Sequence, residues 1–378
     1  MRIAVAIFIV GYCLVPLGGV LAQTDPVSDV VPDEIPPQEF YRAEVIQILE
    51  ETEQNVGDYV NHVQILKVKI LNGDEEGSEV EIRDEGVLGL NKPFRLDVGD
   101  QIVIGKLSQF DEPFYFVADK YRLPSLGWVL ALFFGAAVLF GGIRGLTSIL
   151  GLAVSILILA VFVVPQILQG RDPLQTTVLG AVMIVCVSLF LAHGFKKRTV
   201  LAFFSTIITF GLAAVISKFF VDFTSLFGLG SEGAFYLQVF PEANINLKGL
   251  LLGGILIGTL GVLDDVTTTQ TAAVDELARA NPDLSRKELY RRGLSIGREH
   301  IASLVNTLAL AYAGAALPLF LLFSLNQDQP LLVILNGEIV AEEAVRTLAG
   351  SLALILAVPI STLLAARFLG RSKKYPQV

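Results

Sequence analysis

Long apolar stretches dominate the chain from residue 126 onward and set its fold class. An α-helix needs about 20 predominantly apolar residues to cross the hydrocarbon core of a bilayer. Seven stretches approach that length, at residues 126–143, 146–165, 175–193, 199–217, 248–267, 301–323 and 347–368. The pattern predicts a mainly α, polytopic membrane bundle of about seven transmembrane helices over residues 126–370.

A shorter periodicity precedes these helices, at residues 40–122. Apolar positions recur there at every second residue, as at Val63 and Ile65 and again at Val68 and Ile70. Alternation of this kind predicts half-buried strands rather than helices. The segments KILNGDEEGSEVEI and FRLDVGDQIVIG resemble five-stranded barrels of the OB type. We therefore expect a small exported all-β domain, an OB-like barrel, before the membrane bundle.

The residues before this domain indicate export. Residues 1–22 carry one basic residue, an apolar run, and small residues at Val20 and Ala22, which together are typical of a secretory signal peptide. The alternative is an uncleaved signal anchor, and both interpretations export the β domain. Residues 23–39 are rich in proline, aspartate and serine, so we expect a disordered linker there.

Composition and charge agree with this plan. Apolar residues make up 53% of the chain, charged residues 17%, and the mean hydropathy is +0.63, as expected of an integral membrane protein. The loops and the tail predicted to be cytoplasmic carry 14 lysines and arginines, whereas the exterior loops carry 4. This bias places residues 23–125 outside and the basic tail, residues 371–378, inside. The exported part holds 22 acidic and 9 basic side chains, so nucleic acid is not an expected partner. No cofactor is expected.

Ionisable residues near the inner edge of the fifth and sixth apolar stretches are the main candidates for function. Helical periodicity places the first group on adjacent stripes of one helix and the second at the start of the next. Because these two helices run in opposite directions across one loop, we expect the groups to lie at similar depth. A carboxylate inside a membrane is expensive and commonly marks a cation or proton path. The candidates are Asp264, Asp265, Thr268 and Thr271 on the first helix and Glu299, His300 and Asn306 on the second.

The structural alternative for this group is an aspartate paired with Arg298 or His300, which would satisfy both charges and pin two helices together. The residue types alone do not identify a metal.

Glycines and prolines within the apolar stretches predict close packing or kinks. Small residues four apart let helix backbones approach, and a proline ring removes a backbone donor. The positions are Gly249, Gly253, Gly254, Gly258, Pro318 and Pro359. No helix breaker follows Gly249 until Asn281 and Pro282, so this helix is expected to run to Ala280 and to project from the bilayer. Gly293 and Gly297 are expected to allow a bend before the sixth stretch.

Several short motifs follow one another between Gly261 and Phe323. They are Asp265-Val266-Thr267, Asn281-Pro282-Asp283-Leu284-Ser285, Ile296-Gly297-Arg298-Glu299-His300-Ile301, Asn306-Thr307-Leu308 and Ala311-Tyr312-Ala313-Gly314. On these motifs the chain resembles the YibE/F family of bacterial multi-pass membrane proteins over residues 126–370. The resemblance implies a location in the bacterial cytoplasmic membrane and a permease-like role. It assigns no catalytic residues.

Three classes of function compete. A transporter or permease for a small ion or solute is favoured by the ionisable candidates beside glycine-rich helices. A non-transporting scaffold or sensor would instead use the exported acidic domain, residues 40–122, to bind an extracytoplasmic protein. An intramembrane hydrolase is not expected, because Asp264 and Asp265 are neighbours on one helix and the helices lack GxGD and G-x-S-x-G patterns.

The expected partners follow from the membrane location. They are the lipid bilayer, anionic lipids along the basic loop at residues 279–298, and a second copy of the chain in a homo-oligomer.

Overall fold

A computed structural model describes residues 38–56, 59–84, 95–107, 113–239, 245–325 and 330–370. They form two compact units that divide between Gly135 and Ala136, and each unit is described by itself. The expected signal peptide at residues 1–22 and the tail at residues 371–378 lie outside the described residues. The expected linker at residues 23–39 lies outside them up to residue 37, and its last two residues, Gln38 and Glu39, begin the first strand.

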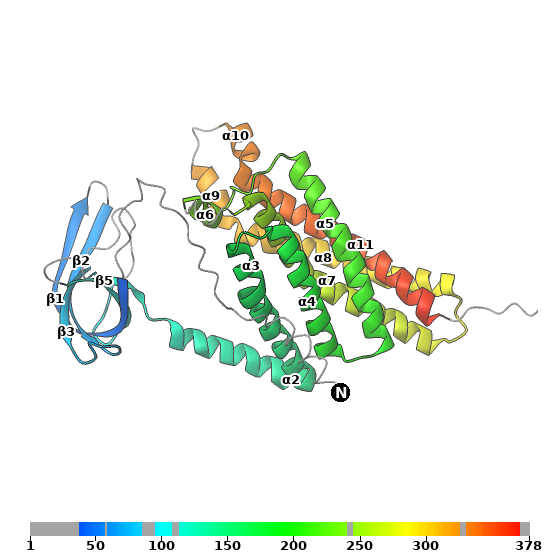
Figure 1. Cartoon of the computed structure of the whole chain (residues 1–378), viewed down its shortest axis with the longest axis horizontal. Coiled ribbons are helices and arrows are strands. Elements are labelled where there is room, and N and C mark those ends of the chain that lie inside the picture. The colour runs from blue at the N-terminus through cyan, green and yellow to red at the C-terminus, as the bar shows by residue number, and fades with distance from the viewer. Residues whose placement is uncertain are drawn as a thin grey trace, which may run out of the picture. The chain divides into compact units, whose positions relative to one another are not determined.

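The first unit contains a curled antiparallel sheet of five strands in the order β3-β2-β1-β4-β5 (Figure 1). The strands are β1 (Gln38–Val56), β2 (Tyr59–Ile70), β3 (Glu79–Asp84), β4 (Gln101–Leu107) and β5 (Phe114–Lys120). Two register shifts, between Val45 and Gln47 and between Ile48 and Glu50, interrupt the pairing of β1 with β2. Such bulges bend a strand and increase its twist. A closed OB-like barrel is not confirmed, because β3 and β5 are the edges of the described sheet.

The predicted period of two is confirmed in this sheet. Alternate residues point into one core, such as Leu66, Val68 and Ile70 on β2, which are fully buried. The buried amide of Gln64 joins the sheet to the segment before β4, because Gln64 Nε2 donates to Leu96 O at 3.2 Å and Gln64 Oε1 accepts from Leu96 N at 3.0 Å. The sheet therefore has a core of its own.

Helices make up most of the described chain from Leu123 onward. They are α2 (Leu123–Ile158), the π-helical turn η1 (Leu159–Val163), α3 (Val164–Leu168), α4 (Pro173–His193), α5 (Lys197–Phe223), α6 (Glu232–Val239), α7 (Leu247–Ala280), α8 (Arg286–Ala315), α9 (Leu317–Leu325), α10 (Leu331–Asn336) and α11 (Glu338–Leu369). Of the described helices, five are long and apolar enough to cross a membrane, counting α2 to α3 as one. The pair α8 and α9, bent by 55°, makes six. The predicted count of seven is not confirmed.

The run from α2 to α3 is too long for one straight span. Its 46 residues would extend about 69 Å at about 1.5 Å per residue, more than twice a hydrocarbon core of about 30 Å. The helix is broken at Gly142, where φ is 57° and ψ is −139°. Glycine adopts such a positive φ without the steric cost that other residues incur. The break coincides with the predicted boundary between the first two apolar stretches.

The helices α5, α7 and α11 form the centre of the second unit and lie side by side (Figure 1). Their facing sides are rich in small residues, including Ala202 and Ala213 on α5 and Ala353 and Ala357 on α11, all buried. Small residues allow the close backbone approach on which helix packing in membranes depends. Large apolar side chains such as Phe204 and Val215 are exposed, as expected where helices face hydrocarbon.

The predicted long helix is confirmed, because α7 is continuous over 34 residues. Asn246 caps its start, accepting a hydrogen bond from Gly249 N at 3.0 Å. After the turn at Pro282, Ser285 caps α8 by accepting from Glu288 N at 3.2 Å. The expected bend at Gly293 and Gly297 is wrong. The helix α8 is continuous there, and both glycines are buried because they are contact points for α7 and α11.

Basic side chains hold the last turn of α11. Lys197 Nζ, at the start of α5, donates to Phe368 O at 2.8 Å, and Arg286 Nε, at the start of α8, donates to Gly370 O at 3.4 Å. The last carbonyls of a helix have no partner within the helix, so these two side chains satisfy acceptors that would otherwise need water.

Candidate functional site

Asp264 lies at the far end of the apolar part of α7. It is 17 residues beyond Leu247, or about 26 Å along the helix at about 1.5 Å per residue. Its side chain is half-buried, with Oδ2 at 3.5 Å from Ser188 Oγ of α4. The other oxygen, Oδ1, is buried and has no hydrogen-bond partner in the described part of the chain. Asp265 is the charged neighbour that acts on this carboxyl, and among the described residues no basic side chain forms an ion pair with it.

Threonine hydroxyls surround the same level of α7. Thr267 Oγ1 lies 2.6 Å from Thr206 Oγ1 of α5, and this buried pair joins the two helices. Thr268 donates back to the carbonyl of Asp264 at 2.9 Å. One turn further, Thr271 is buried, and its hydroxyl has no partner among the residues that the structure describes. Asp264 therefore lies at the end of a polar stripe rather than in a wholly apolar wall.

The candidates on α8 are not joined to the carboxylates of α7. Glu299 and Asn306 are exposed, His300 is half-buried, and Asp265 is exposed. Within the described part of the chain, no hydrogen bond or ion pair links Asp264 or Asp265 to Arg298, Glu299 or His300. Of the seven candidates, the described contacts join only the hydroxyl of Thr268 to the backbone of Asp264 and Asp265.

Gln270 makes the polar contact between α7 and α8 that the sequence did not single out. This side chain is 1% exposed, and its Nε2 donates to Gly293 O and to Thr362 Oγ1, both at 2.8 Å. One amide thereby connects α7, α8 and α11. In sequence it is a single glutamine within a threonine-rich run, and no spacing rule distinguishes it from a solvated residue.

The predicted packing glycines have different environments. A Cβ at Gly253 would lie 2.7 Å from Thr177 Oγ1 of α4, and one at Gly249 would lie 3.3 Å from Pro173 Cδ. Gly258 faces Tyr312, whose hydroxyl would lie 3.2 Å from an added Cβ, whereas Gly254 faces open space within the described structure. Pro318 lies in the first turn of α9, just after the break from α8, and Pro359 lies inside the continuous α11.

A second group of charges, absent from the sequence-based candidates, lies where α11 begins. Glu338 Oε1 accepts hydrogen bonds from the backbone N–H groups of Phe227, Gly228 and Leu229 at 2.7, 2.9 and 3.2 Å. Glu342 Oε1 accepts from Gly230 N at 2.8 Å. These carboxylates hold the segment that connects α5 to α6. The spacing of four between Glu338 and Glu342 at a helix start was the available sequence signal.

No group of three or more His, Cys, Asp or Glu side chains that could hold a metal ion occurs among the described residues. A family model described as YibE/F-like protein matches residues 129–371, more than half of the chain. The chain belongs to the YibE/F-like family. The match confirms the resemblance seen in the motifs around α7 and α8. The match and the apolar helices of this YibE/F-like chain together fit a membrane protein. Comparisons with curated proteins and with solved structures found no match.

Proposed function

We propose that this YibE/F-like protein is a transporter in which Asp264 binds and releases a proton or a small cation. One observation carries the proposal: among the described residues, buried Asp264 Oδ1 has no hydrogen-bond partner and no basic counter-charge, inside an apolar helix. An ionised carboxylate in that position is costly unless it is neutralised. Neutralisation by a mobile proton or cation gives the side chain two states, which a relay requires.

The surrounding hydroxyls support the same role. Ser188 Oγ is within 3.5 Å of the carboxylate, and the threonine stripe continues from Thr267 toward Thr271, whose hydroxyl has capacity to accept or donate. Hydroxyl oxygens are hard ligands that suit a proton or an alkali cation. Of the two neighbouring aspartates, Asp264 is the better candidate, because Asp265 is exposed.

The proposed orientation places the end that carries Lys197 and Arg286 in the bacterial cytoplasm, as the excess of basic residues at that end favours. The role is not enzymatic. The proposed partners besides the bilayer are anionic lipids at residues 279–298 and further copies of the chain.

Proton flux in proteoliposomes tests the proposal. Purified full-length protein is reconstituted with a trapped pH-sensitive dye, and a pH step is applied while potassium and valinomycin clamp the membrane potential. Asp264→Asn should slow the flux at least about tenfold, because the amide cannot titrate, whereas Asp265→Asn should cause a smaller loss. Glu276→Gln, an exposed position on the same helix, is the control. Wild-type flux equal to that of empty vesicles, or unchanged flux in Asp264→Asn with protons and with sodium, contradicts the proposal.

A scaffold or sensor role is the second candidate, and the exported sheet offers one observation for it. Phe40 and Phe114 are exposed on either side of β4, where they pair with Gly105 and Leu107. Exposed aromatic side chains at this spacing suit a protein partner. Deleting residues 40–120 separates the two roles. A scaffold loses its interactions, whereas a transporter keeps measurable flux.

A further inference from the structure

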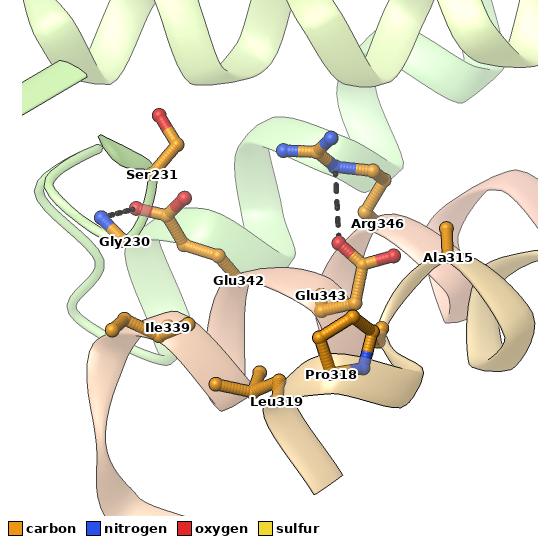
Figure 2. Close-up of a pocket in the computed structure, with 10 residues that line it drawn as sticks. Gly230, Ser231, Ala315, Pro318, Leu319, Ile339, Glu342, Glu343 and Arg346 are labelled. Atoms are coloured by element: carbon orange, nitrogen blue, oxygen red, sulfur yellow. Dashed lines mark hydrogen bonds and ion pairs between the residues drawn. The ribbon is translucent and has the colours of Figure 1, made fainter. Parts of the chain in front are cut away.

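A cavity opens at the end of the helical unit where α8 breaks and α11 begins. Its volume is about 310 Å³. Figure 2 shows its two sides. Glu342 points toward Gly230 and Ser231, and Glu343 points toward Arg346, with Pro318, Leu319 and Ile339 on the remaining wall. The cavity therefore combines charged groups of both signs with an aliphatic surface.

The charged groups are built into the fold rather than scattered on its surface. Glu342 is 3% exposed, and the N–H of Gly230 fixes one of its oxygens at 2.8 Å. A Cβ at Gly230 would lie 2.6 Å from Glu342 Cδ, so only glycine leaves room for this carboxylate. Glu338, bound to three backbone amides, holds the same loop in place. Because these contacts come from two separate segments, the carboxylate position is preorganised.

Arg346 has unused hydrogen-bonding capacity. Its Nε is 3.9 Å from Glu343 Oε2, which is within ion-pair range but too long for a hydrogen bond. The same Nε is buried and has no hydrogen-bond partner among the described residues. A buried donor without a partner is unfavourable, so a ligand that supplies an acceptor here is stabilised by satisfying it.

We propose that this cavity binds a small zwitterion that carries an ammonium group, a carboxylate and an aliphatic side chain, as a neutral aliphatic amino acid does. The ammonium group binds Glu342 and Glu343, the carboxylate binds Arg346, and the side chain lies against Pro318, Leu319 and Ile339. The volume is at the lower end of the range of about 300–1,000 Å³ for small-molecule sites, and about ten times the volume that one water occupies in the liquid. A bare cation would leave most of that space unfilled and would not use Arg346.

As the solute of a transport cycle this ligand rests on the proposed function, but its binding to the cavity is a separate property. The probe for the cavity is L-leucine. If leucine does not bind while Asp264→Asn still abolishes flux, only the assignment of the cavity is wrong. If leucine binds and flux is unchanged in Asp264→Asn, only the proposed role of Asp264 as an ion relay is wrong.

Binding of tritiated L-leucine to the purified full-length protein in detergent tests the proposal, by scintillation proximity. We expect saturable binding that Arg346→Met weakens at least about tenfold, since a hydrogen bond between charged groups is lost. Arg367→Met, an exposed arginine at the other end of α11, is the matched control. Glu342→Gln should weaken binding similarly. Because Glu342 is buried, its replacement can disturb folding, so a circular-dichroism melt checks that this variant is folded. Glu343→Gln, at a half-buried position, is tested as a second variant.

Competition identifies which part of the ligand is recognised. Isopentylamine lacks the carboxylate and 4-methylpentanoate lacks the ammonium group, so each should compete at least about tenfold more weakly than leucine. Three results overturn the proposal: no saturable leucine binding up to about 10 mM, unchanged affinity in Arg346→Met, or isopentylamine binding as tightly as leucine. Tighter binding of glycerophosphoethanolamine than of leucine would assign the cavity to a lipid headgroup of similar charge and would also overturn it.

Discussion

Replacing Gly297 by alanine should destabilise the helical unit, although alanine is the better helix former. A Cβ at Gly297 would collide with Val358 Cγ1 of α11 and would lie 3.0 and 3.1 Å from Gln270 Nε2 and Oε1. Gln270 is buried and makes its hydrogen bonds to Gly293 O and Thr362 Oγ1 from that position. The methyl group therefore disturbs the place where α7, α8 and α11 meet.

The expected loss is about 1–3 kcal/mol. Overpacking of a tight contact costs about 1–3 kcal/mol. Displacing Gln270 weakens two hydrogen bonds, each worth about 0.6 kcal/mol on average in a membrane protein, or about 1 kcal/mol together. The higher helix propensity of alanine returns about 1 kcal/mol. The loss of hydrogen bonding and the gain in helix propensity cancel, so the overpacking term determines that Gly297→Ala lowers the stability.

Equilibrium unfolding of purified protein by SDS in mixed micelles, followed by far-ultraviolet circular dichroism, measures this loss. Gly261→Ala is the matched control, because Gly261 is also helical, and an added Cβ there meets no heavy atom of the described structure within 4 Å. That variant should be neutral or more stable by up to about 1 kcal/mol. Adding Val358→Ala to Gly297→Ala should recover part of the loss. Equal stability of Gly297→Ala and Gly261→Ala would refute the reasoning.

Three further predictions concern other contacts. Hydrogen bonds from Lys106 and Tyr115 lower the pKa of Glu75 from its usual 4.5, so the stability that they contribute is present above pH 4.5 and is lost as the pH falls. The protection factors of the β4 and β5 amides in the full-length protein, which are corrected for the pH dependence of intrinsic exchange, should fall on acidification, and less so in Glu75→Gln. A double-mutant cycle of Thr206→Val and Thr267→Val should give a coupling energy of about 0.5–1.5 kcal/mol in SDS unfolding, and additive effects would argue against their hydrogen bond. Glu338→Ala should increase amide exchange at residues 227–229 at least about tenfold, and Glu338→Gln should do so less, since the amide keeps an acceptor oxygen.

Periodicity predicted the two kinds of secondary structure because it reports which residues share a face. The alternation at Val68 and Ile70 and the unbroken run from Gly249 to Ala280 both gave correct elements. The bend expected at Gly293 and Gly297 was wrong, because these glycines allow a close contact between helices instead of a break. Only the position of Val358 on another helix decides between these outcomes.

The candidate residues were harder to rank from the sequence. The sequence does not distinguish Asp264 from Asp265, because they are the same residue type at neighbouring positions. The packing of α4 against α7 partly buries Asp264 and leaves Asp265 exposed. The cavity at the start of α11 depends on Gly230 and Glu342, which are 112 positions apart in the chain. Two residues so far apart in the chain produce no periodic pattern in the sequence, so their contact is seen only in the folded structure.

The two cationic side chains at the end of α11 have a consequence for experiments on orientation. Topology is commonly tested by neutralising lysines and arginines in a loop and asking whether the protein inverts. Lys197 and Arg286 also bind the carbonyls of Phe368 and Gly370. Neutralising them would remove hydrogen bonds to the last turn of α11 and would also change the charges that direct insertion. A lower amount of protein in such variants could therefore come from fraying of this turn or from inverted insertion, and the two causes would not be separated. Arg279 or Arg291, whose ion pairs lie within their own helices, are the cleaner positions for that test.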